Sequence, residues 1–138
     1  VLEMEDVPDF GSQRKALSDA TAIFLRQNFT HSSKSIKVLM DHDFLVVRVD
    51  HFLSPAEIKM GKEKSSTYLI HEMYSKLFDR VKSSLVDRIE TITRKKVKSS
   101  QININLENEL CVMVFFLEPK LNGEKMRLTL LVAPQEKE

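Results

Sequence analysis

The sequence is poor in the residue types that build disulfide scaffolds and phosphate-binding loops. Its 138 residues include one cysteine, Cys111, so an intrachain disulfide is excluded. Cys111 lies within an apolar run, which predicts a buried, reduced thiol of the kind found in cytoplasmic proteins. Only three glycines are present and they are not clustered, which excludes a loop that cradles phosphate groups. We therefore expect a cytoplasmic protein that folds without a cofactor.

Long apolar runs and an excess of one charge are also missing. The longest apolar run, 110–117, is far shorter than the roughly 20 residues that a membrane-spanning helix needs, so we expect no membrane insertion. Lys and Arg exceed Asp and Glu by only 21 to 20, a balance that gives no general attraction to nucleic acid. The basic run 94–98 contains no aromatic residue and is typical of a helix carboxyl end. We predict no nucleic-acid partner.

The strongest pattern in the chain predicts a long amphipathic helix that starts after Leu53. Ser54 is the expected N-cap, Pro55 the first helical residue, and Glu57 completes a capping box. Gly61 predicts a bend or break in the polar part between 59 and 66. The basic residues 94–96 end the helix, where its dipole favours cations. Apolar residues at spacings of three and four form its expected buried face: Ile70, Tyr74, Leu77, Val81, Leu85, Ile89 and Ile92.

Shorter patterns predict one helix before this element and hairpins on both sides of it. Ser12 is the expected cap of a helix that runs to about residue 28. Alternation predicts strands at 36–40 and 44–49 around an acidic turn, and at 100–106 and 110–117 around a second one. The strands 44–49 and 110–117 are apolar on both faces, which favours central positions in a sheet. A fifth strand at 126–132 is expected at an edge.

Together these elements predict an α+β fold of two layers. An antiparallel sheet of four to five strands carries a short and a long helix on one face. We expect a linker or tail at 1–11, a single domain at 12–133 and a frayed tail at 134–138. The predicted core packs the long helix against the sheet through Ile70, Leu77, Val81, Leu85, Val46, Val112 and Val114.

A displacement of 66 positions lays the first hairpin on the second. Ile36 falls on Ile102, and Val46 falls on Val112. The chain is therefore readable as two helix-hairpin units, either by duplication or because alternating strands with acidic turns converge on this pattern.

In the order and spacing of three short motifs, the sequence resembles the bacterial MpsC-like family between Lys15 and Pro119. The motifs are Leu53-Ser54-Pro55-Ala56-Glu57, Thr93-Arg94-Lys95-Lys96-Val97 and Phe116-Leu117-Glu118-Pro119. The resemblance implies a small cytoplasmic protein associated with a sodium-dependent membrane-potential-generating system linked to inorganic carbon uptake. It brings no catalytic residues. Arg94 stands where the family pattern has glycine, which raises the question of how the long helix ends.

Two groups of polar residues are candidate sites. Asp41, His42 and Asp43, with His51 nearby, include metal-ligating types, but this pattern is good turn chemistry and we predict no metal site. Arg48 is a charge in an apolar strand, and Asp50 lies on the same face two positions on. The two side chains either form an ion pair on the solvent side of the sheet, or they contribute to a ligand pocket or interface on the face away from the helices.

The predicted function is a non-enzymatic binding or regulatory module, accessory to a membrane ion or bicarbonate transport system. Its ligand is a protein or a small molecule. The alternative is a small enzyme whose acid and base, His51, His71 and Glu118, come together in space.

A homodimer is also predicted, because a second apolar row runs beside the main face of the long helix. Phe78, Val86 and nearby Leu69 form this row, and soluble monomers seldom expose large apolar patches. Either the overhanging helix or a free sheet edge is expected to form the interface. The other interpretation is that Phe78 and Val86 widen the core-facing stripe under the first helix. The candidate ligand or interface residues are thus Arg48, Asp50, His51, Phe78 and Val86.

Overall fold

Four strands with alternating or continuous apolar residues form one antiparallel sheet. The computed structural model describes residues 10–29 and 35–118. The strands are β1 (Ser35–Met40), β2 (Phe44–Asp50), β3 (Val97–Asn105) and β4 (Leu110–Leu117). They lie in the order β1-β2-β4-β3, so the two strands that are apolar on both faces are central, as predicted. Each predicted hairpin is present, and β2 joins β4 between them.

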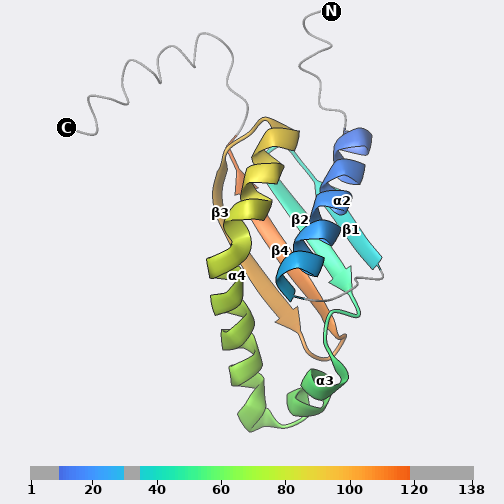
Figure 1. The fold of residues 1–138 in the computed structure, drawn as a ribbon, viewed down its shortest axis with the longest axis vertical. Helices are drawn as coiled ribbons and strands as arrows, with labels where there is room; N and C mark the ends of the chain where they lie inside the picture. Colours follow the sequence, from blue (N-terminus) through green and yellow to red (C-terminus); the bar gives the residue numbers. More distant parts are fainter. Residues whose placement is uncertain (1–9, 30–34, 119–138) are drawn as a thin grey trace, which may run out of the picture.

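The described helices all lie against one face of this sheet, and none of them covers the other, which we call the open face (Figure 1). They are α2 (Phe10–Phe29), the short α3 (Pro55–Gly61) and α4 (Lys64–Thr93). The predicted two-layer α+β architecture is confirmed. Helix α2 begins at Phe10, so Ser12 lies inside its first turn rather than at its N-cap. The fifth strand at 126–132, the tail at 134–138 and most of the predicted linker lie outside the described residues.

The long helix begins and breaks where local chemistry predicts. Ser54 and Glu57 form the capping box, with each side chain bonded to the other residue's backbone N–H at 3.2 and 2.9 Å. The helix then breaks after Gly61, and α4 starts at Lys64. A Cβ atom added to Gly61 would lie 3.2 Å from Leu106 Cδ2. Glycine therefore lets the end of α3 approach the β3–β4 turn closely.

The face of the two central strands that packs against the helices is the opposite of the predicted one. Leu45, Val47 and Val49 of β2 are buried in the core, as are Met113 and Phe115 of β4. The prediction that Val46, Val112 and Val114 pack against the helices is wrong. These valines alternate with the buried residues and are half-buried on the open face.

The buried face of α4 also differs from the prediction, because Val81 and Ile92 are only half-buried beside the core and one further position is exchanged. Phe78 is 1% exposed and belongs to the core, whereas Leu77, predicted to be buried, is 39% exposed. The Phe78 ring packs against Phe24 of α2 and Phe115 of β4, with centroids 6.5 and 6.2 Å away. The larger aromatic side chain thus fills the space between the two helices and the sheet. Ile70, Tyr74, Leu85 and Ile89 are buried as predicted.

The two hairpins do not superimpose under the displacement of 66. That shift carries Val38 onto Ile104, and both residues are buried. It also carries Val47 onto Met113, although these two residues pair with each other across β2 and β4. However, Val38 pairs with Val47, whereas Ile104 pairs with Cys111 instead of Met113. The second hairpin is therefore slipped relative to the first, and the resemblance between the units stops at their element order.

Arg94, where the resemblance implied a glycine, ends α4 in the left-handed conformation. Its backbone has φ 59° and ψ 32°, and its N–H donates to the Glu90 carbonyl at 2.8 Å. The cap geometry is thus the common αL type, with a residue that has a Cβ atom. L residues pay for this conformation, because Cβ crowds the carbonyl oxygen that follows it.

We expect Arg94→Gly to raise the free energy of unfolding by about 0.5–1 kcal/mol, because glycine adopts this backbone without steric cost. Urea titration of the variant and the parent measures the difference. Lys95→Gly is the matched control, since position 95 does not have positive φ, and it is expected to destabilise. A loss of stability in Arg94→Gly would mean that contacts of the arginine side chain stabilise the fold by more than the left-handed backbone at this residue destabilises it.

Candidate functional site

The open face of the sheet carries the predicted Arg48–Asp50 pair. Arg48 Nε donates to Asp50 Oδ1 at 3.0 Å, and their side chains are 50% and 21% exposed. Arg48 lies opposite Lys37 of β1 and Val112 of β4, both on the same face. The prediction that the two residues pair on the face away from the helices therefore agrees with the geometry. Whether they also contact a ligand stays a prediction.

Around this pair the open face is largely apolar at its centre. Three large side chains, Leu39, Phe44 and Phe116, are exposed, and the register makes the patch continuous through Val46 and Val114. We call this surface the sheet face. Its residues are Lys37, Leu39, Phe44, Val46, Arg48, Asp50, Gln101, Asn103, Val112, Val114 and Phe116.

The three proposed acid-base residues do not converge. His51 follows the end of β2, beside Phe52, whose N–H donates to the Glu109 carbonyl. Glu118 follows the end of β4, which is the opposite end of the central strand pair because β2 and β4 are antiparallel. About six residues of strand, or about 20 Å, separate the two positions. His71 is exposed on α4. The prediction of a site made from these residues is wrong.

His51 has a backbone role instead. Its φ of 55° is in the left-handed region, and the turn it makes directs the chain from β2 toward α3. Its side chain is exposed. Within residues 10–29 and 35–118, no three His, Cys, Asp or Glu side chains are grouped so that they could hold a metal ion.

The predicted apolar row on α4 does not form a surface. Phe78 lies in the core, and Val86 is half-buried and packs against the core cluster. The prediction that these two residues form a dimer interface is wrong, and the other interpretation, a wider core-facing stripe under the first helix, is correct. Leu69, the third member of the row, is 57% exposed.

A different apolar stripe does face solvent, and sequence reasoning missed it. Leu69, Met73 and Leu77 recur at a spacing of four on α4, and all three are exposed. Met73 and Leu77 also line an open pocket of about 350 Å³ between the end of α2, the start of α3 and α4. We call the stripe and this pocket the helix groove. The pocket is lined by Asn28, Phe29, Ser54, Glu57, Met73, Tyr74 and Leu77.

A satisfied polar network forms the floor of the helix groove. The Tyr74 hydroxyl donates to Glu57 Oε2 at 2.6 Å, while Glu57 Oε1 accepts the Ser54 backbone N–H. Burial, followed by the hydrogen bond to Glu57, raises the pKa of Tyr74 far above its usual range. Tyr74 therefore stays neutral at all physiological pH values. Glu57, which the sequence predicted as part of the α3 cap, thus also holds the Tyr74 side chain of α4 in place.

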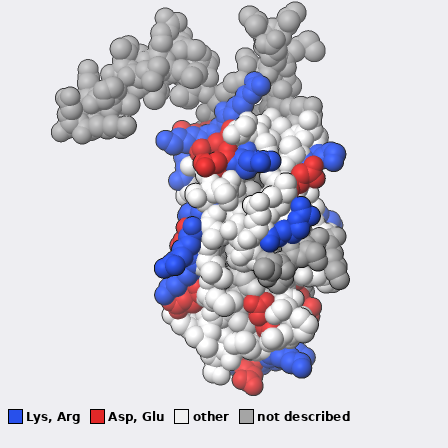
Figure 2. Space-filling model, viewed as in Figure 1, with Lys and Arg blue, Asp and Glu red and all other residues white. Residues whose placement is uncertain are grey.

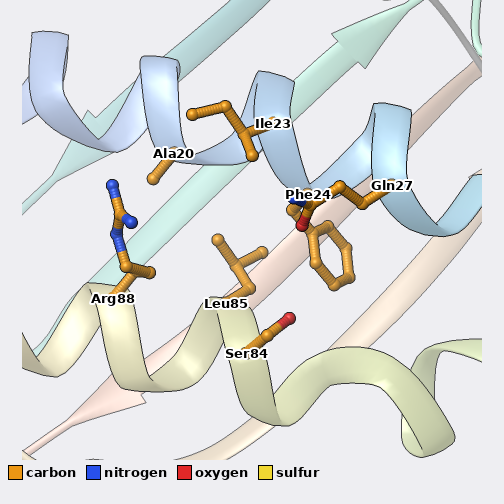
Figure 3. A pocket seen from close by; sticks show the side chains of 7 residues that line it. All are labelled: Ala20, Ile23, Phe24, Gln27, Ser84, Leu85 and Arg88. Carbon is orange, nitrogen blue, oxygen red and sulfur yellow. The ribbon is translucent and has the colours of Figure 1, made fainter.

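A second hollow lies between α2 and α4 (Figure 3). Ala20 and Phe24 of α2 and Leu85 of α4 form its apolar part, and Arg88 and Gln27 stand at its sides. Its volume of about 180 Å³ is below the 300–1,000 Å³ typical of ligand pockets. We interpret it as a gap left by small residues at a helix crossing. Figure 2 shows the same side of the molecule, with Lys and Arg along the outer edge of α4 and much of the remaining surface uncharged.

Comparison with known proteins assigns the chain to a family. Among the helices of the described residues, none is both long and apolar enough to cross a lipid bilayer. No curated protein and no solved structure matches the chain. The family model described as Na+-translocating membrane potential-generating system (MpsC) matches residues 11–119. Because this match covers well over half of the 138 residues, the chain belongs to the MpsC family, as its motifs predicted.

Proposed function

We propose that the chain is a non-enzymatic module that works at the cytoplasmic side of a membrane ion transport system and binds one of its subunits through the helix groove. The family description links the chain to a Na+-translocating system that generates membrane potential. The observation that carries the proposal is the exposed apolar stripe of Leu69, Met73 and Leu77, which continues into a pocket of ligand-binding size.

The chemistry of the groove favours an amphipathic helix as its occupant. The stripe spans nine residues of α4, whose eight steps of 1.5 Å give a length of about 12 Å, which matches two to three turns of a second helix. The stripe itself is apolar, and among the polar groups that line the pocket the Tyr74–Glu57 pair and the Asn28 side chain are already hydrogen-bonded within the protein. An incoming segment therefore needs to supply apolar side chains at helical spacing and no buried polar group.

We expect Met73→Lys and Leu77→Lys to abolish this function without unfolding the protein, because both side chains are partly exposed and a lysine can extend into solvent. The measurement is the Na+-dependent membrane potential, read with a potential-sensitive dye in native cells that express each variant in place of the parent. Both variants are expected to match a deletion strain.

Ile23→Lys is the matched control, since Ile23 of α2 is 38% exposed and lines neither the helix groove nor the sheet face. It is expected to keep the parental potential. Detergent extraction of the same cells provides a second readout, in which an integral membrane protein co-purifies with the parent and the control but not with the groove variants. A parental potential in both groove variants would contradict the proposal.

A further inference from the structure

The charged side chains around the helix groove are unequally paired. Between residues 55 and 80 there are five Lys or Arg and four Asp or Glu. Three of the four carboxylates have partners within the protein, which are Tyr74 for Glu57, Lys76 for Glu72 and Lys82 for Asp79. In the part of the chain that the structure describes, four of the cations have no ion-pair partner, namely Lys59, Lys62, Lys64 and Arg80. The remaining anion is Glu63, so the unpaired charge beside the groove is mostly positive.

Arg80 lies in line with the apolar stripe of the groove. It follows Leu77 by three positions and Leu69 by eleven, and eleven positions are close to three turns of a helix. Its side chain is exposed, and no described carboxylate is bonded to it. The guanidinium group therefore stands about one turn beyond the end of the stripe. Its stem extends the apolar surface, and its N–H groups are available to a carboxylate of a bound partner.

The three unpaired lysines lie near the other end of the stripe. Lys59 is in α3, Lys62 follows α3, and Lys64 is the first residue of α4, five positions before Leu69. All three are exposed, and Glu63 is the anion among them. A segment that covers the stripe thus meets an apolar surface at its centre and cations toward both ends. Interfaces between proteins commonly have this arrangement of an apolar core and a charged rim.

We propose that the occupant of the helix groove is an acidic amphipathic helix, with apolar side chains at its centre and carboxylates toward both ends. The inference rests on the proposed function, since it takes the helix groove as the binding site and adds the charge of the partner. Carboxylates of the partner pair with Arg80 at one end and with Lys62 and Lys64 at the other. A basic helix with the same apolar row would meet like charges at both ends, which disfavours it.

The shape of the groove distinguishes a helix from an anionic lipid surface, which also combines negative charge with apolar groups. Met73 and Leu77 lie on the wall of an open pocket of about 350 Å³, and Tyr74 forms part of its floor. A concave site of this kind receives the side chains of a docked helix. A bilayer is contacted instead by residues that project from the protein surface. The pocket therefore favours the helix.

Two fluorescent peptides test the charge of the occupant. The distance along α4 from Lys64 to Arg80 is sixteen positions, or about 24 Å, so peptides of about 18 residues span the site as helices. Both carry the same row of leucines at helical spacing, and they differ in having either Glu or Lys near both ends. Fluorescence anisotropy in about 0.1 M salt measures their binding to the full chain. The acidic peptide is expected to bind about tenfold more tightly, and equal affinities would overturn the proposal.

Arg80→Glu is expected to weaken binding of the acidic peptide about tenfold and to strengthen binding of the basic one. Arg88→Glu is the matched control, because Arg88 is also exposed on α4 and has no ion-pair partner within the described residues. It borders the second hollow instead of the groove, and eight positions, or about 12 Å, separate it from Arg80. This distance exceeds the screening length of about 10 Å, so a change below about twofold is expected. Equal weakening by both variants would overturn the proposal.

Met73→Asn separates this inference from the proposed function, because it removes an apolar contact of the groove and changes no charge. Loss of binding of both peptides, combined with equal affinities of the parent for the two, would retain the groove as the binding site and reject the acidic partner. Unchanged binding of the acidic peptide would reject the groove itself.

Absence of acidic-peptide binding at millimolar concentration would also overturn the proposal. Sedimentation of the parent chain with vesicles of phosphatidylserine and phosphatidylcholine would then identify an anionic lipid surface as the occupant.

Discussion

Phe78→Ala is expected to lower the free energy of unfolding by about 3–5 kcal/mol, the range for truncating a buried phenylalanine. The Phe78 side chain is 1% exposed and contacts aromatic rings on α2 and β4. Its removal leaves a cavity where the two helices meet the sheet, and none of the three elements can close it alone. Denaturant titration followed by circular dichroism measures the loss.

Leu77→Ala is the matched control because it removes an apolar side chain from the next position on the same helix. Leu77 is 39% exposed, and we expect its truncation to cost less than about 1 kcal/mol. Similar losses in the two variants would mean that α4 is rotated relative to the sheet. A larger loss of stability in Leu77→Ala than in Phe78→Ala would mean that Leu77 lies on the buried face of α4, as the periodicity predicted.

The stability of the chain is expected to fall as the pH rises above 9, by up to about 1.4 kcal/mol per pH unit. Burial raises the pKa of the Cys111 thiol from its ordinary 9.0 to about 12. Between these values the unfolded chain releases the thiol proton and the folded chain keeps it. Deprotonation therefore favours unfolding, and the contribution is fully present below pH 9. Urea titrations at pH 8, 9 and 10 measure the slope.

Cys111→Ala isolates the thiol from other groups. The variant loses some stability at every pH, because a buried sulfur is removed, but its slope between pH 9 and 10 is expected to be much smaller than that of the parent. Tyr74, whose pKa is also raised, adds a decline that begins only above pH 10. Equal slopes in the parent and the variant would show that the thiol is accessible to water in the folded protein.

Local signals in the sequence predicted well where the long helix begins and where it breaks, although they placed the start of α2 at Ser12 instead of Phe10. The capping box at Ser54 and Glu57 and the break after Gly61 depend on neighbours within a few positions, so the sequence contains all the relevant partners. The central places of β2 and β4 followed from their apolar composition on both faces. Pairing of the two hairpins through these strands then follows, since each central strand needs a second neighbour.

The face that each strand turns to the helices was harder to predict, because β2 and β4 are apolar at nearly every position. One residue did carry the answer. Arg48 lies on the same face as Val46, since side chains two positions apart point the same way. A solvent-facing Arg48 therefore requires that Val46 also faces away from the helices. In α4, Leu77 and Phe78 are both apolar and suit a buried position. Only the packing of the folded chain shows which of the two contacts α2.

The helix groove could not be predicted because its lining comes from three elements. Phe29 ends α2, Glu57 lies in α3 and Met73 in α4, and their approach depends on how the short helix folds back after β2. The spacing of Leu69, Met73 and Leu77 was visible in the sequence. It was masked by the neighbouring core stripe, which uses the same period.

The pairing of β2 with β4 has a consequence for the order of folding. Residues 47 and 113 are partners across this seam although 66 positions separate them, whereas the partners nearest the first turn, 40 and 45, are five positions apart. Loop-closure entropy makes the long-range pairing about 2 kcal/mol more costly to initiate than the local one. We therefore expect each hairpin to form ahead of the seam, and the joining of the two hairpins to be the slower step. Until the hairpins join, both central strands expose a free edge, and crowding of nascent chains at this stage favours exchange of halves between molecules.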